Sequence, residues 1–193
     1  MSLIRPTTAA RAAAVALAAV AALAGCQSAP TAPAAQPPAA ALTAPAPADD
    51  PAQAPRCTLD QLTPSLGRTT GEAGQRHTTV VWTNTSTTAC LMHGFGGVDL
   101  EGPDDPMGPT YSLRRTSASP ESFSVEPGQA AHFVITWLPP QDGPGWTPTG
   151  MLVTPPDETR SAHLDWPGGA VLRQDGATHP GTYFGPVAPG AEG

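Results

Sequence analysis

The sequence predicts an all-β protein, an immunoglobulin-like antiparallel β-sandwich over residues 56–193. Pro (25) and Gly (20) are abundant among 193 residues, and aromatic residues make up only 5%. Proline removes a backbone donor and glycine adds conformational entropy, so this composition disfavours long helices and suits turns. Short β-branched and aromatic runs alternate with turn signals about every ten residues, which is typical of a sandwich.

The two clearest strands are His77–Asn84 and Ala131–Leu138, which are rich in Thr, Val and aromatic residues. Alternation along the second strand predicts that one face of a sheet carries Ala131, Phe133, Ile135 and Trp137. Shorter strands are expected at Cys90–Met92, Val98–Glu101, Tyr111–Thr116, Ser122–Val125, Met151–Thr154 and Ala162–Trp166.

Turn residues separate these strands. Thr85–Ala89 and Phe95–Gly97 are expected to be turns, and Pro103–Pro109 is expected to be a loop. In Glu126-Pro127-Gly128, proline presets φ and glycine supplies a positive φ, so we expect a tight turn there. A domain of about 138 residues can bury roughly two-thirds of its unfolded surface, which is enough for one core.

Residues 1–25 have the pattern of a bacterial lipoprotein signal peptide. Arg5 and Arg11 form a positive start, and residues 12–23 form an apolar run that is short of the ~20 residues needed to span a bilayer. The run ends in Leu23-Ala24-Gly25-Cys26, which matches the lipobox at which Cys26 is lipidated and becomes the new N-terminus. Two acyl chains would hold the protein on the extracytoplasmic side of the cell membrane. The alternative is an ordinary signal peptide with an incidental cysteine.

Residues 26–55 are predicted to be a disordered tether that begins at the lipidated cysteine. After Cys26 the segment is almost entirely Ala and Pro, without apolar periodicity, so it cannot form a core. Proline at this density favours extended polyproline II at ~3.1 Å per residue, which would lift the domain off the membrane. A Pro-rich ligand for a partner domain is the alternative interpretation.

Three cysteines are present, and with Cys26 lipidated the remaining pair is Cys57 and Cys90. An exported protein meets an oxidising compartment, where such a pair forms a disulfide. A metal thiolate pair and a redox dithiol are the alternatives, although the two residues lack C-x-x-C spacing.

The formal net charge of -7 disfavours nucleic acid as a partner, since nucleic-acid binding needs a basic surface. The charged pairs Asp104-Asp105 and Asp157-Glu158 lie in Pro-rich loops and are expected to be solvated. We find no G-x-S-x-G motif, no Ser-Lys pattern and no Cys-His pattern, so the sequence predicts a monomeric, non-enzymatic protein without a cofactor.

The five histidines lack the close spacing typical of metal sites, so no metal site is predicted. The adjacent Met92 and His93 nevertheless leave open a small copper- or other metal-handling protein as the alternative function. His93 with Phe95 could instead line a loop-based binding surface at one end of the sandwich.

The four tryptophans are divided by their neighbours. Trp82 and Trp137 lie within strands and are expected in the core, whereas Trp146 and Trp166 lie beside Pro and Gly and are expected at the surface. The candidate binding surface therefore comprises His93, Phe95, Trp146 and Trp166, and the expected partner is a cell-wall polymer or an envelope protein. Asn84-Thr85-Ser86 fits the N-glycosylation pattern, but we interpret it as a turn.

Three parts of the chain form a recognisable set of strand and turn segments: Arg76–Ser86 leading into Ala89–Gly97, Val125–Ala130, and Val153–Thr159. Together they resemble the domain-of-unknown-function 4232 family of secreted and lipid-anchored actinobacterial proteins. The resemblance covers most of residues 56–193 and implies a β-sandwich in an extracytoplasmic setting, with no assigned activity.

The chain departs from the family pattern at one point. Many members carry a second cysteine pair in the late half, where this chain has Gly145–Pro148 and Gly169–Leu172. We hypothesise that an apolar contact between Trp146 and Leu172 replaces this bridge.

Overall fold

The computed structural model describes residues 54–191, which are β-strands and connecting loops. The predicted signal peptide, Cys26 and the tether up to residue 53 lie outside the described residues. Within residues 54–191, no helix has the length and apolar character needed to cross a membrane.

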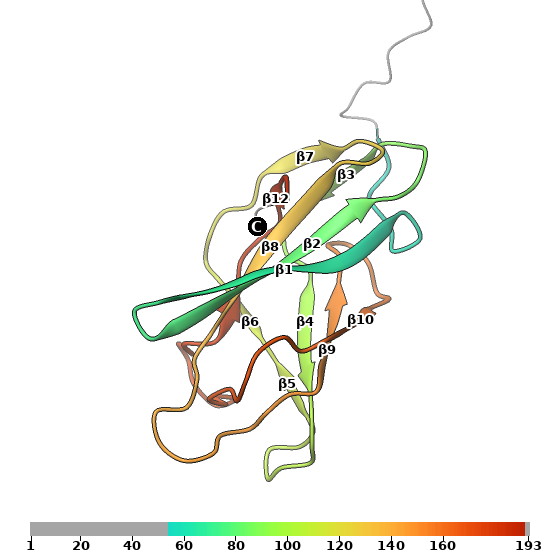
Figure 1. Ribbon diagram of the computed structural model, residues 1–193. Helices are drawn as coiled ribbons and strands as arrows, with labels where there is room; N and C mark the ends of the chain where they lie inside the picture. Colours follow the sequence, from blue (N-terminus) through green and yellow to red (C-terminus); the bar gives the residue numbers. More distant parts are fainter. Residues whose placement is uncertain (1–53, 192–193) are drawn as a thin grey trace, which may run out of the picture. The chain divides into compact units, whose positions relative to one another are not determined.

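The described part of the chain forms two packed sheets and a small ribbon (Figure 1). The larger sheet has the order β1-β2-β8-β11-β6, with β12 also paired to β8; the second has the order β10-β9-β4-β5, and β3 pairs with β7. Neighbouring strands are antiparallel except β11 and β6. The bounds are β1 Leu62–Glu72, β2 Gln75–Asn84, β3 Cys90–His93, β4 Gly97–Glu101, β5 Thr110–Ser112, β6 Arg114–Arg115, β7 Ser122–Val125, β8 Ala130–Trp137, β9 Gly150–Thr154, β10 Ala162–Asp165, β11 Tyr183–Phe184 and β12 Ala188–Pro189.

The fold confirms the predicted antiparallel β-sandwich. All the strands expected from the sequence are present, with ends shifted by at most two residues. The exception is Tyr111–Thr116, which divides at the buried Leu113 into β5 in one sheet and β6 in the other. The chain therefore changes sheets at this residue and closes one side of the sandwich.

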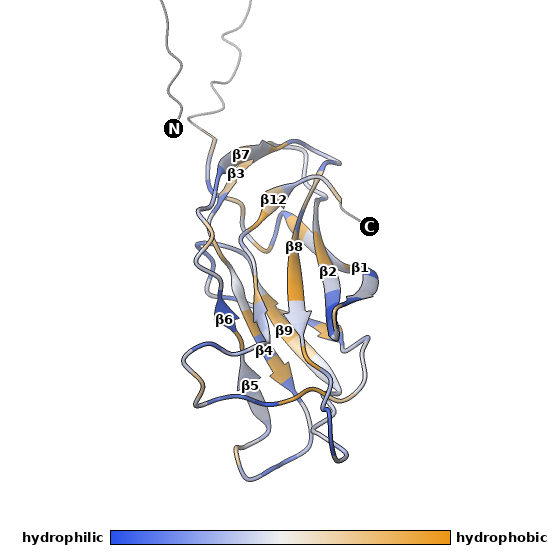
Figure 2. Ribbon diagram, turned by 90° about the vertical axis from the view of Figure 1, so that its left-hand side faces the viewer, coloured by the Kyte–Doolittle hydropathy of each residue, from blue (hydrophilic) through white to orange (hydrophobic). Residues whose placement is uncertain are grey.

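The core lies between the two sheets, where the apolar residues of β4, β8 and β9 face one another (Figure 2). Ala131, Phe133, Ile135 and Trp137 are all buried, as the alternation along β8 predicts. Trp82 and Trp137 are also in the core, as expected. Burial of such aromatic side chains is the main source of stabilisation in a small sandwich.

Strand β1 was not expected from the sequence. It pairs with β2 through the two-residue turn Ala73-Gly74, in which φ is 47° and 85°. Two positive φ values match a type I′ turn, whose twist suits a β-hairpin. Asn-Gly is the usual sequence signal for this turn. Here the first turn residue is Ala73, so the sequence does not predict the hairpin.

Strand β1 lies at the edge of the larger sheet, and two features break its regularity. Pro64 has no N–H to offer, and the pairing with β2 shifts between Leu66 and Thr69. Proline and bulges at a sheet edge limit pairing with a further strand. Pro64 and the register shift therefore make β1 hard to predict from the sequence and also limit edge-to-edge aggregation.

Asn84 is fully buried and organises the turn after β2. Its Nδ2 donates to the carbonyls of Thr88 at 2.9 Å and Val125 at 2.8 Å, while its Oδ1 accepts from the Ser86 N–H at 3.0 Å. These bonds tie the end of β2 to β7. They confirm the turn expected at Thr85–Ala89.

Candidate functional site

The four residues of the predicted binding surface do not come together. Trp146 and Trp166 are 6% and 8% exposed and belong to the core, so the prediction that they are at the surface is wrong. Each indole N–H donates to a carbonyl at 2.9 Å, that of Pro103 for Trp146 and that of Gly169 for Trp166. These two rings therefore do not contribute to the binding surface predicted from the sequence.

The neighbouring glycines explain why both rings are buried. A Cβ on Gly102 would lie 2.8 Å from Trp146 Cζ2, and one on Gly168 would lie 3.0 Å from Trp166 Cε2. Trp166 also packs edge-on against Trp137 with ring centroids 5.2 Å apart. Glycine here makes room for an indole. Of these two glycines only Gly168 is a sequence neighbour of its tryptophan, and the sequence prediction took it as a sign of exposure.

His93 and Phe95 are half-buried beside the β3–β7 ribbon. His93 Nδ1 is hydrogen-bonded to Ser122 Oγ at 3.0 Å, and Phe95 packs edge-on against Phe184. The guanidinium carbon of Arg115 lies 5.9 Å from the centre of the Phe95 ring. These two residues remain candidates for a surface, but one separate from Trp146 and Trp166.

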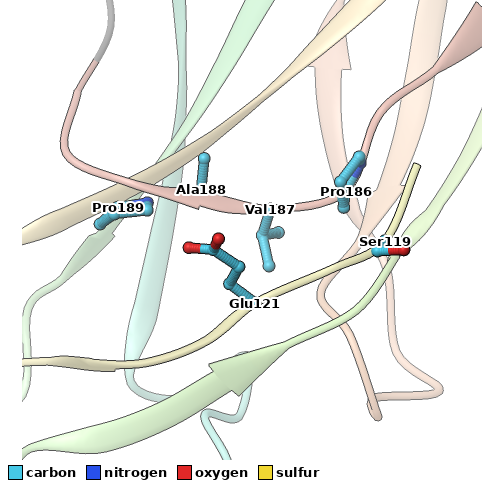
Figure 3. Close-up of a pocket in the computed structure, with 6 residues that line it drawn as sticks. All are labelled: Ser119, Glu121, Pro186, Val187, Ala188 and Pro189. Atoms are coloured by element: carbon cyan, nitrogen blue, oxygen red, sulfur yellow. The ribbon is translucent and has the colours of Figure 1, made fainter. Parts of the chain in front are cut away.

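A shallow hollow of about 170 Å³ lies next to this region (Figure 3). It is lined by Ser119, Glu121 and the segment Pro186–Pro189, and the Glu121 carboxylate extends toward Ala188 and Pro189. The Val187 N–H donates to the Gly94 carbonyl, which joins the hollow to the His93–Phe95 turn. The sequence does not mark this hollow, because neither of its walls, the loop with Ser119 and Glu121 and the segment that includes β12, carries a motif.

The arrangement of β3 argues against the metal-handling alternative. Met92 is 1% exposed and points into the core, while His93 points to the opposite face of the strand. The two side chains therefore do not face the same ion. Within residues 54–191 there is also no group of three His, Cys, Asp or Glu residues placed to hold a metal.

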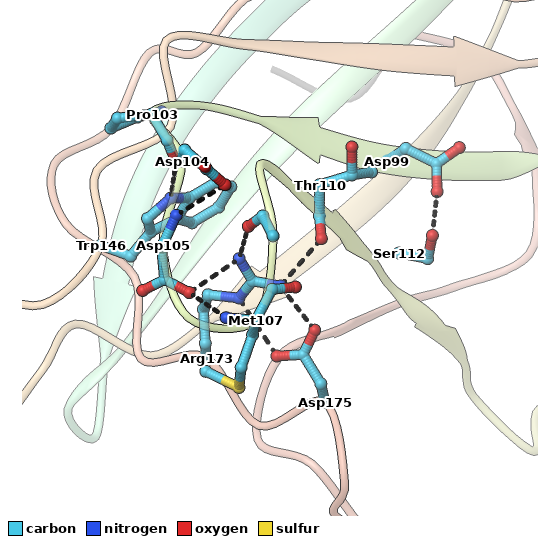
Figure 4. A network of polar contacts seen from close by, with 11 residues as sticks. Asp99, Pro103, Asp104, Asp105, Met107, Thr110, Ser112, Trp146, Arg173 and Asp175 are labelled. Atoms are coloured by element: carbon cyan, nitrogen blue, oxygen red, sulfur yellow. Dashed lines mark hydrogen bonds and ion pairs between the residues drawn. The ribbon is translucent and has the colours of Figure 1, made fainter.

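The most extensive polar site surrounds Arg173, which no motif singled out (Figure 4). Its side chain is 2% exposed, and its guanidinium carbon lies 4.8 Å from the centre of the Trp146 ring and 5.5 Å from that of Tyr111. Asp175 accepts two hydrogen bonds, from Nε at 3.1 Å and Nη2 at 2.7 Å. We call Arg173 with these neighbours the Arg173 cluster.

The Arg173 guanidinium also binds the loop between β4 and β5, residues 102–109, and the first residue of β5. Nη2 donates to the carbonyls of Met107 at 3.0 Å and Thr110 at 2.8 Å, and Nη1 donates to that of Gly108. Nη1 also pairs with Asp105 at 3.4 Å. The expectation that Asp105 is simply solvated is therefore wrong, because its carboxylate is part of the ion-pair network.

The second acidic pair also has a structural role. The Glu158 side chain is 13% exposed, and its carboxylate accepts from the Leu59 N–H at 3.1 Å and the Thr159 N–H at 2.9 Å. The backbone N–H groups of Leu59, Thr159 and Arg160 lower the pKa of Glu158 to about 2. The expectation that Glu158 is solvated is wrong as well.

Glu158 belongs to a set of contacts that fix the first described residues to the sandwich. Cys57 and Cys90 form the predicted disulfide, with Cα atoms 4.8 Å apart. The Leu91 N–H donates to the Pro55 carbonyl at 2.8 Å, and the Cys57 N–H donates to the Leu91 carbonyl at 3.0 Å. We call residues 55–60, with Cys90, Leu91 and 157–160, the N-terminal joint.

Besides the ion pair between Arg160 and Glu158 at 3.2 Å, two exposed ion pairs complete the N-terminal joint. Arg160 binds both carboxylate oxygens of Asp60 at 2.9 Å, and Arg56 pairs with Asp157 at 3.4 Å. The hydrogen bond from Arg160 is the largest cause of the lowered pKa of Asp60. These pairs are exposed, so each contributes little alone, and the disulfide and the Glu158 contacts stabilise the joint most.

The two segments proposed to replace a second disulfide do pair, through Trp146 and Val171. Val171 is fully buried, whereas Leu172 is only partly buried. Arg173, two positions after Val171, covers the Trp146 ring. Trp146 therefore contacts this segment through the bridge to Val171 and the guanidinium of Arg173, and its contact with Leu172 stays a prediction.

Comparison with known proteins gives a family and no function. The family model described as "Domain of unknown function (DUF4232)" matches residues 57–184. No curated protein matches the chain.

Proposed function

The chain belongs to the DUF4232 family, and because this family carries no assigned activity, we propose a function from the residues themselves. The protein is a lipoprotein anchored to the extracytoplasmic side of the cell membrane through Cys26. Its β-sandwich is a non-enzymatic binding module of the cell envelope that recognises an envelope protein or a cell-wall polymer.

The disulfide within the N-terminal joint is the observation that carries the proposed location. Disulfides persist in oxidising compartments outside the cytoplasm, and Cys57–Cys90 staples the domain directly after the lipobox and the Ala/Pro-rich segment. The leader, the lipobox and the disulfide all favour the extracytoplasmic side of the membrane. The N-terminal joint fixes residues 55–60 to the sandwich, which suits a protein that is held from its N-terminal side.

Binding is favoured over catalysis by the roles of the polar residues. Asp105 and Glu158, which could otherwise act as acids or bases, hold a buried arginine and the N-terminal joint. Ser122 and His93 are hydrogen-bonded across the ribbon, but Ser122 is exposed, and within residues 54–191 no acid is seen to orient the imidazole. A Ser-His nucleophile needs such an orienting group.

Intact mass spectrometry of the protein from membranes of its native host tests the anchor. We expect a chain that starts at Cys26, carries acyl chains and gains about 2 Da on reduction of the disulfide. A Cys26→Ser variant is the control and should lose the acyl mass. An unlipidated mature chain would overturn the anchor, and an unchanged mass on reduction would overturn the disulfide.

A further inference from the structure

The described part of the chain contains the tripeptide Gln-Asp-Gly twice, as Gln141-Asp142-Gly143 and as Gln174-Asp175-Gly176. We propose that Asp142 is a site of spontaneous isomerisation to isoaspartate in the folded protein, and that the Arg173 cluster protects Asp175 from the same reaction. Aspartate followed by glycine is the sequence most open to this reaction, because glycine has no Cβ to hinder its backbone nitrogen. The chemistry needs no partner, so it is independent of the binding role proposed above.

The reaction moves the chain path from the backbone to the side chain in two steps. The Gly143 backbone nitrogen attacks Cγ of the Asp142 carboxyl group, so that a C–N bond forms, the nitrogen loses its proton and the carboxyl oxygen leaves as water. The product is a five-membered succinimide, which water then opens at one of its two carbonyls. Cleavage of the bond between nitrogen and Cγ restores aspartate, whereas cleavage of the original peptide bond leaves the chain running through Cγ, as isoaspartate. Water leaves in the first step and returns in the second, so no other reactant is needed.

At Asp175 both the carboxylate and the backbone are held (Figure 4). Each carboxylate oxygen accepts one hydrogen bond from Arg173, from Nε at 3.1 Å and from Nη2 at 2.7 Å. The Ala177 N–H donates to the Gln174 carbonyl at 3.0 Å, which closes a turn around Asp175 and Gly176. The carboxylate would have to leave the guanidinium, and the turn would have to open, before the Gly176 nitrogen could reach Cγ.

Asp142 lacks these restraints. It lies in the exposed connection between β8 and β9, and within residues 54–191 neither its carboxylate nor the Gly143 N–H makes a hydrogen bond or an ion pair. Exposure alone does not distinguish the two sites, because the Asp175 side chain is itself 33% exposed. The tripeptides are identical, so the sequence alone predicts equal reactivity. The contacts of Asp175 are what separate the two sites.

The two ends of the β8–β9 connection are fixed, which confines the effect of the modification. The Leu172 N–H donates to the Leu138 carbonyl at 2.8 Å, and the Val171 N–H donates to the Trp146 carbonyl at 2.8 Å. Isoaspartate adds one methylene group to the backbone path. The exposed connection at residues 139–145 can take up this addition without moving the core, as surface loops take up insertions. The reaction therefore requires no unfolding, and the modified protein should stay folded.

A time course of isoaspartate formation at the two sites tests the proposal. The full mature chain is incubated in its folded state at neutral pH and digested with trypsin, which places the sites in separate peptides, 116–160 and 174–193. Chromatography with electron-transfer fragmentation distinguishes the aspartate and isoaspartate forms of each peptide. We expect isoaspartate to form at Asp142 about tenfold faster or more than at Asp175, which reacts only in the fraction of molecules whose contacts are open. In denatured and reduced protein the two rates should become similar.

Asp142→Glu is the matched control, because glutamate would have to close a six-membered ring, which forms more slowly. This variant should lose the isoaspartate signal of the peptide 116–160 and keep the slow rate at Asp175. Equal rates at the two sites of the folded protein would overturn the protection by Arg173. Absence of isoaspartate at Asp142 in the folded protein would overturn the modification site. A rate at Asp175 that stays slow after denaturation would show that local sequence, rather than the fold, sets the difference, and would also overturn the proposal.

Discussion

Breaking the disulfide of the N-terminal joint should change how the domain responds to a pulling force. Residues 58–89, which include β1 and β2, lie within the covalent loop closed by Cys57 and Cys90. In the oxidised protein, tension applied from the N-terminal side passes from Cys57 directly to Cys90 in β3. The hairpin β1–β2 carries none of it. In the reduced protein the same tension must strip β1 from β2.

The magnitude follows from the length of the closed loop. The two cysteines are separated by 33 positions and their Cα atoms by 4.8 Å. At ~3.3–3.6 Å per residue, the stretched loop adds about 110 Å to the unfolded contour. The oxidised domain should therefore release about 110 Å less chain on unfolding than the reduced one. In the chain-entropy model the same loop stabilises the domain by roughly 3.5–4 kcal/mol.

Optical tweezers with handles at the two ends of the mature chain provide the assay. Cys26→Ser is present throughout, so that no third thiol can exchange with the pair. We compare the oxidised protein with a Cys57→Ser/Cys90→Ser variant and with the protein in reductant. Equal contour lengths in all three samples would refute the disulfide and this force path. If the oxidised protein released more chain than the other two samples, Cys57 and Cys90 would not close the loop inferred here.

Three further predictions concern stability measured by urea denaturation. Folding lowers the pKa of Glu158 from 4.5 to about 2, so its contribution to stability is present above pH 4.5 and is lost as the pH falls toward 2. Glu158→Gln should therefore lower the free energy of unfolding at pH 7, and the difference from the wild-type protein should shrink as the pH falls from 4.5 to 2. A difference that does not change with pH would contradict this prediction. Asn84→Ala leaves the Val125 and Thr88 carbonyls without their donor and should cost ~2–3 kcal/mol, with Asn84→Asp no better because it also lacks the amide donor. Ala73→Asn should stabilise by ~0.5–1 kcal/mol because φ is 47° at this position, whereas Ala73→Val should destabilise; the reverse order would refute the type I′ turn.

Sequence analysis found the strands that have a strong local signal. Strand β8 is rich in β-branched and aromatic residues, and the face predicted to be buried is buried, although His132 and Thr136 on its other face are buried as well. Strand β1 has Pro64, Gly67 and Gly71 and is largely exposed, so neither propensity nor alternation marks it. Its place is set by pairing with β2 and by two positive φ values at Ala73-Gly74, both of which depend on residues outside the strand.

The Arg173 cluster could not be predicted for a related reason. Its acceptors come from Asp105, Met107, Gly108, Thr110 and Asp175, and its two aromatic covers come from β5 and from the segment before β9. Nothing in the spacing of these residues marks them as neighbours, because the sheet topology brings them together. The disulfide, by contrast, follows from counting cysteines once Cys26 is assigned to the lipid.

The positions of Trp146 and Trp166 suggest a more general rule for small sandwiches. Burial of an indole is strongly favoured, provided that its N–H finds an acceptor. Turns beside the ends of strands have carbonyls that no ladder uses, and those of Pro103 and Gly169 accept these two N–H groups. Glycine next to the ring removes the Cβ that would otherwise collide with it. A tryptophan in a turn can therefore close a small sandwich when a free carbonyl accepts its N–H and a glycine lies beside its ring in space, as Gly102 does for Trp146 and Gly168 for Trp166.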